Sequence, residues 1–100
     1  MPAPDDLSAV VSSIPIGKVA SYGVVGQALK NPASGYFVGR WMGYGADDMP
    51  WWRVVAKDGK MPVWKRNPNY ERIQIERLQA EGVEFVDGKV DMVRFAVGVL

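Results

Sequence analysis

The sequence contains no cysteine and no histidine among its 100 residues. Without cysteine there is no disulfide and no thiolate nucleophile, and without either residue there is no Cys/His zinc site and no histidine-based triad. Carboxylates, lysine, tyrosine, serine and backbone groups are the chemical groups that remain. We therefore expect no metal, no cofactor and none of the common thiol- or histidine-dependent reactions.

Long apolar runs are also missing. A transmembrane helix needs about 20 consecutive apolar residues, and no run in the sequence approaches that length. No basic start followed by an apolar stretch indicates a secretory signal. With 48% hydrophobic and 23% charged residues, the composition is typical of a globular chain. We expect a single domain over residues 1–100, a cytoplasmic location and no membrane partner.

The formal net charge is only +1, but the charges are unevenly distributed. Residues 18–66 carry eight basic and three acidic side chains, whereas the rest of the chain carries four basic and eight acidic ones. Such a basic middle region indicates either one basic face that meets an anion or an ordinary fluctuation of charge along a chain.

Apolar residues with helical spacing predict three short helices in the first half of the chain, over about residues 7–14, 22–30 and 33–44. Ser21 and Ser34 are candidate N-caps for the second and third helices. Asn31 and Pro32 separate these two helices, because the residue before a proline avoids helical backbone angles. Two short helices joined by such a tight break are typical of a helix-turn-helix.

The second half of the chain is predicted to be mixed. A buried strand is expected over residues 51–55 and a small β-hairpin over residues 85–90. Between them, the pattern predicts a helix over about residues 70–81 with Gly82 directly after its end. The expected fold class is therefore mainly α with a small β element.

Glycine recurs every four residues on the third predicted helix, at Gly35, Gly39 and Gly43, with Tyr36 and Arg40 beside it. Each glycine costs a helix roughly 1 kcal/mol relative to alanine. Because glycine permits close backbone approach, this face indicates either tight packing against a neighbouring helix or contact with a nucleic-acid groove.

Four segments of the chain occur in an order and spacing that resemble the O6-alkylguanine-DNA alkyltransferases. They are residues 14–23 (IPIGKVASYG), 31–39 (NPASGYFVG), 50–55 (PWWRVV) and 78–83 (LQAEGV). The similarity extends from about Ile14 to Asp91, and four ordered motifs are far more specific than one. The resemblance implies the helix-turn-helix, winged-helix-like DNA-binding domain of that family.

Three positions depart from the alkyltransferase pattern. Trp51 stands where the enzymes have their reactive cysteine, Trp52 where they have histidine, and Tyr36 where they have an arginine finger. Tryptophan in the cysteine position is typical of the alkyltransferase-like proteins, which bind alkylated guanine without repairing it and mark it for nucleotide excision repair. Without cysteine and histidine, Glu81, a relay carboxylate in the enzymes, is expected to be structural, and Trp52 to belong to the core.

The resemblance implies a DNA-binding surface on the third predicted helix. That helix would lie in the minor groove, with Tyr36 as the wedge that enters the base stack and with Gly35 and Gly39 allowing close backbone approach. Arg40 would contact a phosphate one turn further along. Tyr22 would press on a phosphate of the target nucleotide; the alternative for Tyr22 is a half-buried tyrosine that anchors its helix.

The resemblance also implies a pocket for a flipped base. Trp51 and Trp64 would form its walls, with Trp51 offering an apolar surface to the alkyl group. Lys65 and Arg66 would lie in the loop over this pocket and meet phosphate or the flipped nucleotide, or else form an ordinary solvated basic loop. Arg53 is expected to be structural.

The function implied is non-enzymatic recognition of O6-alkylguanine in duplex DNA by minor-groove binding and nucleotide flipping. The expected partners are double-stranded DNA containing alkylated guanine and proteins of nucleotide excision repair, and the expected state is a monomer, at the nucleoid if the source is bacterial. A second hypothesis is a protein-interaction module that no longer binds lesions, with a tryptophan-rich contact surface. A third is an enzyme with a nucleophile other than a thiol.

Overall fold

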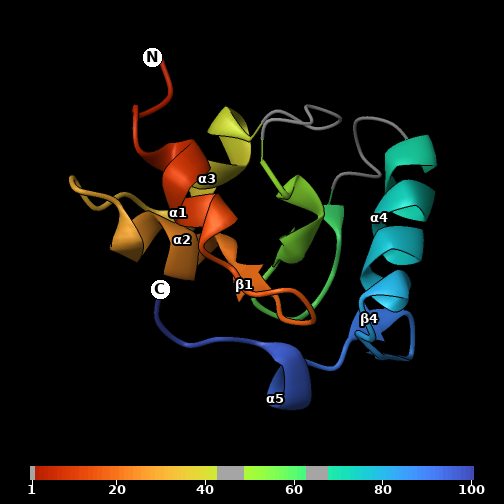
Figure 1. The fold of residues 1–100 in the computed structure, drawn as a ribbon. Coiled ribbons are helices and arrows are strands. Elements are labelled where there is room, and N and C mark those ends of the chain that lie inside the picture. The colour runs from red at the N-terminus through yellow and green to blue at the C-terminus, as the bar shows by residue number, and fades with distance from the viewer. Residues whose placement is uncertain (1, 43–48, 63–67) are drawn as a thin grey trace.

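The computed structural model describes residues 2–42, 49–62 and 68–100 (Figure 1). Five α-helices, one 3-10 turn and four two-residue strands make up this part of the chain, which confirms a mainly α fold with a small β element. The elements are α1 (Leu7–Ser12), β1 (Ala20–Ser21), α2 (Tyr22–Ala28), α3 (Gly35–Trp41), η1 (Trp51–Arg53), β2 (Val54–Val55), α4 (Pro68–Ala80), β3 (Phe85–Val86), β4 (Lys89–Val90) and α5 (Met92–Phe95). None of these helices is long and apolar enough to cross a membrane.

The predicted helix-turn-helix is confirmed as α2 and α3. Ser21 caps α2, because its hydroxyl oxygen accepts a hydrogen bond from the Val24 N–H at 3.2 Å. Ser34 occupies the N-cap position of α3, although its side chain makes no capping bond. The Ala33 N–H donates to the Gly26 carbonyl at 3.0 Å, which fixes the connecting turn against the end of α2.

Gly26 sets the distance between α2 and α3. It is buried, and a methyl group in place of its hydrogen would overlap the Ala33 carbonyl and lie 3.2 Å from Val38 Cγ2. Backbone cannot move aside as a flexible side chain can, so only glycine lets the turn and α3 pack this closely on α2.

A parallel pairing that the local sequence pattern did not predict joins the two halves of the chain. β1 pairs with β2 in the register Ala20 with Val54 and Ser21 with Val55. The predicted strand over residues 51–55 is therefore correct only for its last two residues. The preceding three form the 3-10 turn η1, because local bonds such as Arg53 N–H to Pro50 carbonyl, at 3.1 Å, replace pairing to another strand.

The C-terminal half contains a longer helix and a hairpin. α4 begins at Pro68, two residues before the prediction, and a proline suits the first turn of a helix because its missing N–H would have no partner there. Gly82 follows with φ +91°, as expected for the residue after a helix. The predicted hairpin is confirmed as β3 and β4, which are antiparallel. α5 was not predicted.

The paired strands β1 and β2 lie between two buried clusters, because successive side chains of a strand point to opposite faces. Ala20 and Val54 face a cluster formed with α1, α2, α3 and Trp51. Val19 and Val55 face a cluster that includes Leu78 of α4 and the hairpin residue Val90. The Val19 N–H donates to the Phe95 carbonyl at 2.9 Å, so the C-terminal segment also packs beside the residue that precedes β1.

A polar network fastens α4 to the segment that carries the two tryptophans. Arg53 donates from Nε to Glu81 Oε1 at 2.9 Å and from NH2 to Glu81 Oε2 at 2.8 Å. The Trp52 indole N–H donates to Glu81 Oε2 at 3.0 Å, and Arg53 NH1 donates to the Ile14 carbonyl at 3.2 Å. The network therefore connects the end of α4, η1 and the chain that leaves α1, and confirms a structural role for Arg53 and Glu81.

Gln74 holds the same segment from the buried side of α4. Its amide Nε2 donates to the carbonyls of Trp52 and Val54, at 3.1 and 3.0 Å. The side chain is only 2% exposed, so these bonds are sheltered from competition with water. Two bonds from one amide fix the backbone where η1 becomes β2.

The charge of Glu81 is stabilised by its partners. Burial on its own raises the pKa of Glu81, but the hydrogen bonds from Arg53 and Trp52, the charge of Arg53 and the Gly17 N–H outweigh it, so the pKa lies below the ordinary 4.5. A carboxylate with a lowered pKa stabilises the folded state above its unfolded pKa, and this contribution is lost as the pH falls through the folded pKa.

We expect Gly26→Ala to lower the free energy of unfolding by about 2–3 kcal/mol, because the added methyl group overlaps backbone that cannot yield without separating α2 from α3. Urea denaturation measures the change. Gly23→Ala on the same helix is the matched control: its methyl group would lie 3.9 Å from the nearest atom, Ser21 Oγ. Helix propensity alone would make both substitutions stabilising, so an equal loss of stability in both variants would contradict the assignment to the close approach at Gly26.

We expect Glu81→Gln to destabilise the chain by about 1–3 kcal/mol at neutral pH, because Arg53 loses its charged partner while remaining mostly buried. Urea titrations across the acid range should show the difference from the unsubstituted chain shrinking below pH 4.5, as Glu81 is protonated. Glu76→Gln, which breaks the exposed pair with Arg72, is the control and should cost about 0.5 kcal/mol or less. A pH-independent difference would contradict the assignment.

Candidate nucleic-acid interface

The outward face of α3 carries an exposed tyrosine that two neighbouring side chains contact. The Tyr36 side chain is 67% exposed, whereas Val38 on the opposite side of the helix is fully buried. Arg40 NH1 donates to the Tyr36 hydroxyl at 3.4 Å, and the guanidinium lies 5.9 Å from the ring centroid. Phe37 meets the same ring edge to face, with centroids 5.5 Å apart. Tyr36 thus projects from the fold between two supporting side chains.

The glycines of α3 have different surroundings. A methyl group at Gly35 would lie 3.0 Å from the Gly23 backbone nitrogen and 3.3 Å from Tyr22 Cβ, so this glycine serves internal packing of α3 on the start of α2. Among the residues that the structure describes, none has an atom within 4 Å of a methyl group placed at Gly39. Within the described part of the chain, packing therefore does not require glycine at position 39. Gly43 lies outside the described residues.

Tyr22 is the first residue of α2 and lies where α2 meets α3. Its side chain is half-buried and packs against the core cluster of α1, α2 and α3. The anchoring contact proposed as the alternative is therefore present. The ring remains partly accessible beside Gly23 and Gly35, so anchoring does not remove it from the surface next to α3.

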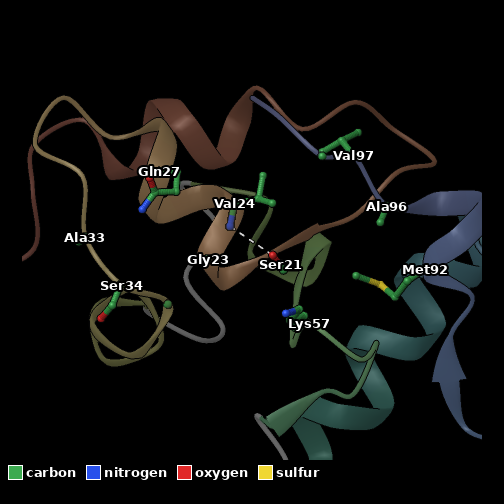
Figure 2. Close-up of a pocket in the computed structure, with 12 residues that line it drawn as sticks. Ser21, Gly23, Val24, Gln27, Ala33, Ser34, Lys57, Met92, Ala96 and Val97 are labelled. Atoms are coloured by element: carbon green, nitrogen blue, oxygen red, sulfur yellow. Dashed lines mark hydrogen bonds between the residues drawn. The ribbon is translucent and has the colours of Figure 1, made fainter.

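A hollow of about 530 Å³ opens between the starts of α2 and α3, the residues after β2 and the C-terminal segment (Figure 2). Ser34 and Gly35 line it on the side of α3, and Lys57 and Met92 line it on the opposite side. Lys57 is exposed and lies two residues after the end of β2. The pairing of β2 with β1 thus places a basic group beside the helix-turn-helix, an arrangement that the basic count of residues 18–66 alone did not reveal.

Trp51 does not form an open wall. Its side chain is 1% exposed and belongs to the core. The rings of Trp52 and Tyr70 meet it edge to face at 6.1 and 6.0 Å, and the Arg77 guanidinium lies 5.8 Å from its centroid. The ring of Trp51, predicted to line the pocket of a flipped base, is enclosed by its neighbours in this structure and offers no surface to a base here. Trp64, Lys65 and Arg66 lie outside the described residues.

Trp52 stands where the alkyltransferases have histidine, so an indole with one N–H donor takes the place of an imidazole. Its N–H reaches Glu81, while the guanidinium groups of Arg77 and Arg53 lie 4.7 and 5.5 Å from its ring. The side chain is half-buried rather than fully enclosed. An indole nitrogen does not take up a proton near neutral pH, so the Trp51, Trp52 and Glu81 arrangement holds no thiolate and no proton-accepting ring.

Comparison with known proteins identifies relatives that match most of the chain. The family model described as 6-O-methylguanine DNA methyltransferase, DNA binding domain, matches residues 4–83. A protein of Vibrio parahaemolyticus named DNA base-flipping protein is 30% identical over 90 residues, which are 87% of each chain.

Two solved structures of S. pombe proteins share the fold. Atl1, in a complex with damaged DNA containing O6-carboxymethylguanine, superimposes with a TM-score of 0.75 at 27% identity, covering 92% of this chain and 91% of that one. An S. pombe ATL in complex with DNA gives a TM-score of 0.68 at 27% identity, covering 85% and 82%. The family model, the base-flipping relative and the shared fold agree with one another. The chain belongs to the 6-O-methylguanine DNA methyltransferase family through its DNA binding domain, as an alkyltransferase-like member without cysteine.

Proposed function

We propose that the protein recognises O6-alkylguanine in duplex DNA without chemical repair, by laying α3 in the minor groove and flipping the lesion nucleotide. The observation that carries this proposal is the outward face of α3, where the exposed and supported Tyr36 lies beside the open Gly39. The relatives support it, since one is named a base-flipping protein and another was solved in a complex with damaged DNA containing O6-carboxymethylguanine.

Tyr36 acts as the wedge that holds the base stack open. Separating a base step costs a few kcal/mol, so a flipped state needs a group that fills the gap. The Tyr36 ring can stack in the gap, and its contacts with Phe37 and Arg40 restrict its rotation before DNA arrives. Restricting the ring in advance lowers the entropy lost on binding.

Basic groups on both sides of the helix-turn-helix position the DNA backbone. Arg40 lies one turn from the wedge, and Lys57 borders the hollow beside Ser34. Lys65 and Arg66 extend this set by their place in the sequence. Contacts with phosphate supply affinity without sequence preference, so lesion selectivity must come from the base that leaves the stack.

Selectivity for alkylated guanine rests first on extrusion, because a poorly paired base costs less to unstack. Trp51 supports the backbone beneath the expected pocket from within the core, while Trp64 remains the candidate for an exposed wall. The absence of cysteine and histidine from the sequence fits a protein that retains the lesion and leaves its removal to other proteins. We propose that it acts as a monomer that marks the site for nucleotide excision repair.

The first test replaces the wedge. We expect Tyr36→Ala to weaken binding to a duplex with one O6-methylguanine by about 1–3 kcal/mol, because base stacking on the ring is lost, and Tyr36→Phe to bind nearly as well as the unsubstituted chain. Fluorescence anisotropy with lesion and plain duplexes of one sequence, at several salt concentrations, measures both effects. Thermal unfolding of each variant is the control for folding.

Three results would contradict the proposal. If Tyr36→Ala bound the lesion duplex as well as the unsubstituted chain, Tyr36 would not be the wedge. If neither duplex were bound in a salt-dependent way, the result would favour the protein-interaction module instead. Changed mass of the base or of the protein after incubation would support the third hypothesis, an enzyme with another nucleophile.

The second test uses one added methyl group to measure the effects on stability and on DNA binding separately. Gly39→Ala places a methyl group in open space, so we expect it to stabilise the isolated protein by about 0.5–1 kcal/mol through helix propensity. The same methyl group would stand between α3 and the groove, so we expect about tenfold weaker binding to both duplexes. Urea denaturation and the anisotropy titration give the two values. Equal or tighter DNA binding would show that this face of α3 does not approach DNA closely.

A further inference from the structure

A second hollow, of about 520 Å³, lies on the other flank of α3. It is bounded by the N-terminal segment, which runs beside α1 and α3 in Figure 1, by the turn of the helix-turn-helix, and by Phe37 and Trp41. These two residues are four positions apart and therefore share one side of the helix. Tyr36 and Arg40, also four apart, share the neighbouring side that faces outward.

The walls of this hollow are aromatic and rigid. The rings of Phe37 and Trp41 are stacked, with centroids 5.7 Å apart and planes at 26°. Phe37 is 39% exposed, although it is a large apolar side chain. Three prolines, Pro2, Pro4 and Pro32, complete the walls. Proline has a fixed φ, which restricts backbone rotation at these three positions of the wall.

The charge of the hollow is negative, unlike the basic region that follows in the sequence. Asp6 is the charged residue among those that line it, and residues 1–17 contain two acidic side chains and no basic one. Asp6 Oδ2 accepts the Lys30 N–H at 2.7 Å, which holds the carboxylate in place. A carboxylate at this position repels a phosphate and attracts a cation, so the occupant is not a DNA backbone.

We propose that this hollow docks an extended segment of a partner protein that carries an arginine among prolines. Aromatic grooves bind extended proline-rich segments by stacking, at a small entropic cost. A guanidinium can lie against an aromatic face and donate to a carboxylate at once, which Phe37, Trp41 and Asp6 together provide.

In these proposals α3 therefore has two binding faces. The Tyr36 and Arg40 side is directed to DNA in the proposed function, whereas the Phe37 and Trp41 side takes a protein segment. A partner bound there would lie directly beside the helix that reads the lesion. The docking inference does not depend on lesion binding, because its charge and its test are separate from those of the wedge, although Phe37 also contacts the Tyr36 ring.

The experiment titrates the isotope-labelled full chain with the blocked peptide Ala-Pro-Pro-Arg-Pro-Pro-Ala and follows backbone and indole resonances by NMR. We expect saturable shifts at Phe37, at the Trp41 indole and in residues 2–6, with a dissociation constant near the millimolar range. A peptide with glutamine in place of arginine, and one with glycine in place of proline, should each bind at least about threefold more weakly.

Variants of the chain locate the contact. We expect Asp6→Asn to weaken binding of the arginine peptide about fivefold, since it removes the charge but retains an oxygen that can accept the Lys30 N–H. Asp5→Asn is the matched control, because it changes the net charge equally at a neighbouring residue outside this hollow, and should leave binding nearly unchanged. Phe37→Ala should also weaken binding, whereas Tyr36→Ala should not.

The following results would overturn the proposal. The peptide would not bind in the hollow if the Trp41 indole resonance did not shift up to about 5 mM peptide. Equal effects of Asp5→Asn and Asp6→Asn on peptide affinity would likewise rule out a specific contact there. Self-association of the free chain with protection of Trp41, measured by sedimentation, would assign the hollow to a second copy. Shifts of the same residues with a thymidine oligonucleotide but not with the peptide would assign it to nucleic acid.

Discussion

The carboxylate of Glu81 is the point at which the separate parts of this small fold are joined. It accepts hydrogen bonds from Arg53 and Trp52, and Arg53 in turn reaches the carbonyl of Ile14. α4, η1 and the chain after α1 are thus connected through one side chain. The arrangement places Val54 and Val55 beside β1, and β1 runs directly into the helix-turn-helix. In the alkyltransferase enzymes the corresponding carboxylate belongs to a catalytic relay; in this chain its partners are structural.

The replacement of cysteine and histidine by two tryptophans changes what this centre can do. Trp51 fills the core and Trp52 supplies an indole N–H to Glu81, so the position that performs chemistry in the enzymes supports packing here. Within the described residues, the recognition surface that we propose lies instead on α3 and in the hollow beside it. In our proposals α3 binds DNA with the side that carries Tyr36 and a second protein with the side that carries Phe37 and Trp41.

Close packing at two glycines makes that surface possible. Gly26 lets the turn before α3 approach α2, and Gly35 lets the start of α3 lie against Tyr22. Both positions orient α3 so that Val38 is buried and Tyr36 is exposed. A methyl group at Gly39 would meet no atom of the described residues, and the contrast between it and the other two glycines is the basis of our proposal that its face meets DNA.

Local features of the chain were determined by the sequence itself. Helical periodicity, the Ser21 cap, the break at Asn31 and Pro32 and the turn before β4 depend on interactions within a few residues, and four ordered motifs identified the family. Three features were decided only by the tertiary structure: the pairing of β1 with β2, the burial of Trp51 and the position of Lys57 beside α3. Each depends on residues far apart in the chain coming together, and periodicity and spacing describe only neighbours. The same sequence spacing placed Gly35 in a tight contact and Gly39 in open space, because what surrounds a helix face is supplied by the rest of the fold.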